Sequence, residues 1–159
     1  MIKSKEEAMG VLLGTNDGPS SVFFTEKRQD GSRGPYYDFI TWDKDNGPDF
    51  AFMISVYGET GDISGGSAPF MSNSHCHATK YYKELLGLTH EEMFALSVEQ
   101  TEAFKNSPEG MALEKFGKRF IPKSNEPYPK PPGGFFIPMD GAWLKGYLAT
   151  VREISGQHN

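Results

Sequence analysis

The sequence predicts an α+β domain in which a three- or four-stranded antiparallel sheet, connected as a meander, packs against about four to five helices. Between residues 20 and 57, short runs rich in aromatic and β-branched residues alternate with clusters of Gly, Pro, Asn and Asp, a pattern typical of strands joined by turns. From residue 78 onward, apolar residues recur at helical spacing behind residues that cap helices. Most of the helices are therefore expected in the C-terminal half.

We expect residues 1–159 to form one domain, because domains most often contain about 100–150 residues. A chain of this length buries roughly two-thirds of its unfolded surface, so a hydrophobic core can stabilise it without disulfides. The expected parts are an N-terminal helix with the meander (1–57), a long loop (58–77), a group of helices (78–120), a proline-rich connector (121–139) and a C-terminal helix (140–155).

The N-terminal part begins with a helix signal. Ser4 and Glu7 form the capping-box pattern, in which each side chain accepts a hydrogen bond from the backbone N–H of the other, and Gly14 ends the helix. Three strands are then expected, at 20–28, 35–43 and 50–57. The last of these is apolar at almost every position, so we expect both of its faces to be covered.

The helical part is expected to contain three helices, at 78–86, 89–105 and 107–120. Thr89 with Glu92 is a second capping box, and Ser107 before Pro108 is a typical helix start. Five prolines between residues 121 and 134 then predict an extended connector.

Two elements are expected after the connector. The run 135–137 is a candidate for one short additional strand at an edge, since Pro138 follows it directly. Asp140 is expected to cap a last helix over 140–155. A strand is the alternative for this segment, because small and large residues also alternate within it.

Charge and composition exclude several classes of function. The net charge of −5 argues against nucleic-acid binding, which needs a basic face. A single cysteine cannot form an internal disulfide and fits a reducing compartment. The longest apolar runs have about four or five residues, whereas a membrane helix needs about 20. We therefore predict a cytoplasmic protein, or a component of a soluble particle, with no membrane partner.

The 58–77 loop contains most candidates for chemistry, and loops longer than about 12–15 residues are usually functional or disordered. Glu59 and Asp62, in a Gly-rich turn, can act as general acid and base. Cys76 comes just before a predicted helix start, where the helix dipole and free N–H groups favour a thiolate nucleophile. These three residues are the catalytic candidates.

Two other kinds of site are open in the same loop. His75 and His77, if extended, point to one face, and such a pair is a common half-site for a divalent transition metal; the cofactor is otherwise unknown. A glycine-rich run can bind an anionic group through backbone N–H groups. The candidate residues for that role are Ser64, Gly65, Gly66 and Ser67. The run matches neither the G-x-x-x-x-G-K-[ST] nor the G-x-G-x-x-G fingerprint of nucleotide-binding loops.

The sequence favours a small non-enzymatic binding or assembly protein: a subunit of a larger particle, an inhibitor or an immunity-type protein. The mild acidity, the proline-rich connector (121–139) and the absence of a complete set of catalytic residues support this interpretation. A protein partner or self-association is therefore expected. Two alternatives stay open. One is a hydrolase that uses the 58–77 loop, and the other is a binder of a nucleotide or another small anionic ligand.

Overall fold

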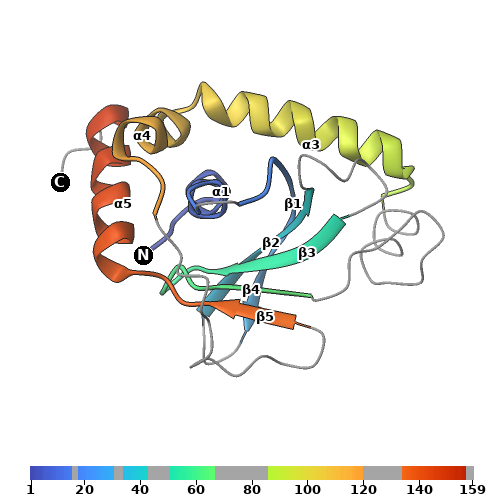
Figure 1. Cartoon of the computed structure of the whole chain (residues 1–159), viewed down its shortest axis with the longest axis horizontal. Helices are drawn as coiled ribbons and strands as arrows, with labels where there is room; N and C mark the ends of the chain where they lie inside the picture. Colours follow the sequence, from blue (N-terminus) through green and yellow to red (C-terminus); the bar gives the residue numbers. More distant parts are fainter. Residues whose placement is uncertain (16–17, 31–33, 43–50, 67–85, 120–133, 157–159) are drawn as a thin grey trace.

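A computed structural model describes residues 1–15, 18–30, 34–42, 51–66, 86–119 and 134–156. Within these residues lie a five-stranded antiparallel sheet and four helices (Figure 1). The strands are β1 (Ser21–Asp30), β2 (Gly34–Trp42), β3 (Ala51–Tyr57), β4 (Ile63–Gly66) and β5 (Gly134–Ile137). The helices are α1 (Lys5–Leu13), α3 (His90–Lys105), α4 (Pro108–Phe116) and α5 (Gly141–Ser155).

The strands lie in the sheet in chain order, and each is antiparallel to the next. The α+β class, the meander and the concentration of helices in the C-terminal half are confirmed. β3 lies in the middle of the sheet, between β2 and β4. The run 135–137 does contribute a strand, β5, which pairs with β4.

The described sheet has one strand more than the sequence predicted, because β4 forms inside the segment expected to be a loop. Only Ile63 among its residues is a strong strand former. β4 is paired on both sides, since Ser64 lies opposite Ser55 of β3 and opposite Phe136 of β5. Pairing with two neighbours therefore stabilises a strand that its own sequence does not specify.

α1 is the central helix of the fold. Figure 1 shows it end-on between the sheet and the other helices. Its residues 7–12 are all buried, and because consecutive residues face all sides of a helix, α1 is covered all round. Gly10 permits this packing, since a Cβ atom there would overlap the hydroxyl of Tyr147 on α5.

Both faces of the sheet contribute to buried clusters. Tyr37 and Phe39 of β2 belong to the main core, with residues of α1, α4 and α5. Ile40 and Trp42, which have the opposite parity in the same strand, pack with Met93 of α3 in a second cluster. The alternation follows from the two-residue period of a strand.

α3 lies along the outer edge of β1. The N–H of Val22 donates to Thr101 Oγ1 at 3.0 Å, and the N–H of Phe24 donates to Gln100 Oε1 at 3.1 Å. An uncovered edge strand presents unpaired N–H and C=O groups that can pair with another chain. The helix therefore satisfies two backbone donors of this edge with its side chains.

The helix caps follow the sequence closely. Thr89 and Glu92 form a complete capping box. The Ser4 hydroxyl accepts from the N–H of Glu7, but the Glu7 carboxylate accepts from the N–H of Lys3 instead of completing the box. Asp140 caps α5, so the last segment is a helix and not the alternative strand.

Other predicted elements either have different bounds in the structure or lie outside the residues that it describes. The predicted helix 107–120 ends at Phe116, where Gly117 takes a φ of 98°. The predicted helix 78–86 and the connector up to residue 133 lie outside the described residues, apart from residue 86. No helix in the part of the chain that the structure describes combines the length and the apolar character needed to cross a membrane.

Candidate functional site

A cleft of about 750 Å³ opens between the N-terminus, the β3–β4 turn and α5. We call it the α5 cleft. Pockets of about 300–1,000 Å³ are typical of sites that bind small molecules or a few side chains of a partner. The cleft is the place where two of the residues that we predicted as catalytic, Glu59 and Asp62, come together.

One wall of the cleft is a stripe of α5. The residues of this stripe are Gly141, Leu144, Lys145, Leu148 and Arg152. Their spacing of three, four, seven and eleven positions from the first places them on one face of a helix. Trp143, Tyr147 and Val151 of the same helix do not line the cleft and pack in the core, and Leu144 and Leu148 belong to this core as well, each with only a small exposed part at the cleft. The amphipathic sequence of α5 thus presents two leucines and two cations to the cleft.

The opposite wall is the turn between β3 and β4, which contributes Glu59, Thr60 and Asp62. Gly61 takes a φ of +77°, and a Cβ there would lie 3.0 Å from Leu144 Cδ2, so glycine is required both by the turn and by its contact with α5. Asp62 Oδ1 accepts a hydrogen bond of 2.7 Å from the N–H of Met139. This bond joins the turn to the residues that precede α5.

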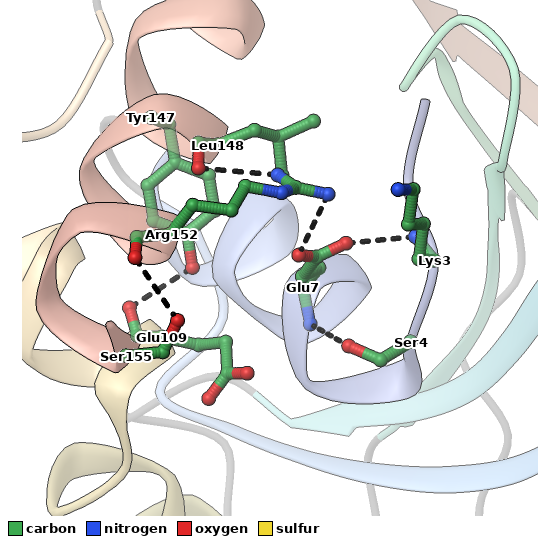
Figure 2. Close-up of polar contacts among 8 residues, drawn as sticks. All are labelled: Lys3, Ser4, Glu7, Glu109, Tyr147, Leu148, Arg152 and Ser155. Atoms are coloured by element: carbon green, nitrogen blue, oxygen red, sulfur yellow. Dashed lines mark hydrogen bonds and ion pairs between the residues drawn. The ribbon is translucent and has the colours of Figure 1, made fainter. Parts of the chain in front are cut away.

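Arg152 is held in place by two acceptors. Its Nη2 lies 3.2 Å from Glu7 Oε2, and its Nη1 donates to the carbonyl of Leu148 at 3.1 Å. The other oxygen of Glu7 accepts from the N–H of Lys3 at 2.7 Å, so Glu7 lies between Lys3 and Arg152 (Figure 2). A guanidinium has five N–H donors, so Arg152 keeps donors for a ligand while its position is fixed.

The other charged groups of the cleft lack ionic partners within the described part of the chain. No ion pair there involves Lys3, Lys145, Glu59 or Asp62. Of the five charged residues that line the cleft, three are cationic and two are anionic. Among these five residues, only Arg152 has an ion-pair partner in the described part of the chain, and that partner is Glu7. The cleft therefore presents charges of both signs without ion-pair partners beside two leucines.

Arg119 is a buried cation near the acidic end of the cleft. Arg119 is 6% exposed, and its Nη1 donates to the carbonyl of Pro138 at 3.1 Å. Its Nε and Nη2 atoms have no hydrogen-bond partner among the described residues. Burial lowers the pKa of Arg119, while the negative charges of Asp62 and Asp140 oppose this shift. Arg119 thus partly offsets the acidic charge of Asp62.

Sequence reasoning missed the cationic residues of the site. Lys3, Lys145 and Arg152 belong to distant parts of the chain, and none of them lies in a motif. A partial signal was present in α5, because Lys145 and Arg152 are seven residues apart and share a face with two leucines. The sequence gives no indication that this face meets the turn at Glu59.

The remaining candidate residues are elsewhere. Ser64, Gly65 and Gly66 lie in β4 and not in a loop: Ser64 and Gly65 have partners in both β3 and β5, and Gly66 has one in β5. Anion binding by this run stays a prediction. The other candidates lie outside the described residues: Ser67, His75, Cys76 and His77. Their thiol and metal chemistry stays a prediction. Within the described ranges, no three His, Cys, Asp or Glu side chains are grouped to hold a metal ion.

The α5 cleft can bind a ligand that carries charges of both signs next to an apolar group. Charged hydrogen bonds from Arg152 and the lysines favour a carboxylate, while Glu59 and Asp62 favour an ammonium or guanidinium group. Comparison of the chain with models of protein families, with curated proteins and with solved structures finds no match. The cleft is therefore the basis on which function is inferred.

Proposed function

We propose that the protein is a small non-enzymatic binding protein that holds a segment of a partner protein in the α5 cleft. The observation that supports this proposal is the set of unpaired charges of both signs around Leu144 and Leu148 within the described residues. Protein interfaces combine an apolar centre with a polar rim in this way. A second copy of the chain is the alternative partner. The proposal places the protein in the cytoplasm or in a soluble particle, because its single cysteine fits a reducing compartment.

A hydrolase is the second candidate function, since Glu59 and Asp62 line the same cleft. Two carboxylates in one cleft can divide the roles of general acid and general base. Asp62, however, already uses one oxygen to accept from the N–H of Met139, which is a structural role at the start of α5. This contact favours binding over catalysis as the function of the cleft.

The proposal is tested by site-specific photo-crosslinking in the cells that produce the protein. A photoreactive benzoylphenylalanine replaces Lys145 inside the cleft, and in the matched control it replaces Met111, which is 44% exposed on α4 and does not line the cleft. We expect a discrete cross-linked partner from position 145 and none from position 111. The partner is then identified by mass spectrometry, and its binding to the purified protein is measured by calorimetry.

Two outcomes contradict the proposal. One is equal cross-linking from positions 145 and 111, since a cleft that binds a partner must favour position 145. The other is turnover of a substrate that Glu59→Gln and Asp62→Asn both abolish while the fold is retained. That second outcome establishes the hydrolase.

A further inference from the structure

The α5 stripe sets the length of a segment that fits the cleft. Gly141 and Arg152 mark its two ends, and at about 1.5 Å per helical residue they lie about 16 Å apart along the axis. An extended peptide advances about 3.3 Å per residue, so about five residue steps span this distance. A compact metabolite does not reach both ends of such a stripe.

The cleft has an acidic end. Asp62 is fixed beside the start of α5 by its 2.7 Å hydrogen bond from the N–H of Met139, and Glu59 lies in the same turn. Asp140 caps the helix at this end. Arg119 is the positive group that opposes them, and it is buried. Three carboxylates against one guanidinium leave this end negative.

The opposite end of the cleft is cationic. Arg152 lies at the far end of the stripe, where Glu7 pairs with it at 3.2 Å. Lys3, whose backbone N–H donates to Glu7, adds an ammonium group without an ionic partner in the described chain. Lys145 adds a second such group between the two ends. One buried carboxylate against two cations, Arg152 and Lys3, leaves this end positive.

The geometry points to one class of segment: an extended stretch of the partner protein with a basic residue near the start of α5, an acidic residue about five positions away near Arg152, and apolar residues between them. Leu144 and Leu148 line the middle of the cleft, where the small exposed part of each, 7% and 6%, would contact these apolar residues. The inference rests on the proposed function, because it specifies the segment that the cleft holds. Charge complementarity along the cleft fixes the order of the three parts.

Four synthetic hexapeptides test the inference directly. Each peptide is blocked at both ends, carries a fluorophore and has the sequence X-Ser-Leu-Leu-Ser-Z. The four peptides are named by their residues X/Z: Lys/Glu, Lys/Lys, Glu/Glu and Ser/Ser. Binding to the purified full chain is followed by fluorescence anisotropy at low salt. We expect the Lys/Glu peptide to bind about fivefold more tightly than each of the others, the scale of one or two partly exposed ion pairs.

Variants that reverse one charge of the cleft should change which of the four peptides binds most tightly. Lys145→Glu should move the preference toward the Lys/Lys peptide, and Glu59→Lys should move it toward the Glu/Glu peptide. Lys118→Glu is the matched control, because Lys118 is exposed and does not line the cleft. This control should leave the ranking of the four peptides unchanged.

The inference is wrong if the four peptides bind with the same affinity or not at all, or if Lys118→Glu alters their ranking as much as Lys145→Glu does. The proposed function is decided separately by the cross-linking experiment. A partner cross-linked from position 145, together with equal binding of the four peptides, overturns the inference and leaves the binding function in place. No partner and no peptide binding overturn both.

Discussion

Glu7 on α1 and Arg152 on α5 form an ion pair that joins the central helix to the wall of the cleft, with 3.2 Å between Oε2 and Nη2. The side chain of Glu7 is 8% exposed and that of Arg152 is 23% exposed. Glu7 also accepts from the N–H of Lys3, so both of its oxygens are used. The pair therefore links the position of the cationic end of the cleft to the packing of α1.

Replacing Arg152 by Leu should lower the free energy of unfolding by about 1–3 kcal/mol, because the substitution leaves the buried carboxylate of Glu7 without its cation. This expected loss of unfolding free energy is smaller than the loss on breaking a fully buried ion pair, because Arg152 is partly exposed and solvent screens its charge. Urea denaturation measures the change. Lys115→Ala is the control, as it breaks the exposed pair with Glu153 and should cost about 0.5 kcal/mol or less. Equal costs for the two variants would show that burial does not strengthen the Glu7–Arg152 pair.

Replacing Thr101 by Val should destabilise the fold by about 1–3 kcal/mol, because the buried N–H of Val22 loses its only acceptor among the described residues. Amide exchange should also become faster at Val22. Thr150→Val is the matched control: its hydroxyl donates to the carbonyl of Gly146 within α5, so its loss should cost about 0.5 kcal/mol or less. An unchanged exchange rate at Val22 would contradict the proposed covering of the β1 edge.

The helix ends were predictable because the determining contacts are local. Ser4, Thr89 and Asp140 each accept from an N–H two or three residues away, so a short window of sequence contains both partners. β4 was not predictable in this way. Ser64 pairs with Ser55 nine residues before it and with Phe136 more than seventy residues after it, and this pairing outweighs the weak strand propensity of Ser and Gly.

The residues of the candidate site were likewise predictable only where they lie close together in the sequence. Glu59 and Asp62 were found because they lie close together in one turn. Lys3 and Arg152 are almost the whole chain apart, and the fold alone brings them to the same cleft. No property of a single sequence window shows which face of α5 meets the turn. The cationic end of the cleft therefore could not be predicted from the spacing of residues in the sequence.

Arg119 should tolerate an apolar replacement of similar length. Burial lowers its pKa, and two of its nitrogens have no hydrogen-bond partner among the described residues, so its charge is poorly compensated. We expect Arg119→Met to change the free energy of unfolding by about 1 kcal/mol or less, or to stabilise the fold. Arg119→Ala should cost about 2–4 kcal/mol because it opens a cavity. If Met is as destabilising as Ala in urea denaturation, the guanidinium contributes more than its burial costs.

Tyr147 should make stability depend on pH in alkaline solution. Burial, followed by the negative charges of Glu109 and Glu7, raises the pKa of Tyr147 well above its ordinary value of about 10. Below about pH 10 the tyrosine is protonated in both the folded and the unfolded state, so it contributes no pH dependence. Above that pH the unfolded state loses the proton while the folded state keeps it, and the free energy of unfolding falls by up to about 1.4 kcal/mol per pH unit.

Tyr147→Phe isolates this effect. At neutral pH the variant should be less stable by about 0.5–1.5 kcal/mol, because it loses the 2.9 Å hydrogen bond from the Tyr147 hydroxyl to the carbonyl of Glu109. Between about pH 10 and 11.5 its stability should fall less steeply than that of the parent, since the remaining tyrosines and lysines are common to both proteins. The two curves of unfolding free energy against pH should therefore converge. Parallel curves over this range would mean that Tyr147 titrates equally in both states, which its complete burial against α1 and α4 argues against.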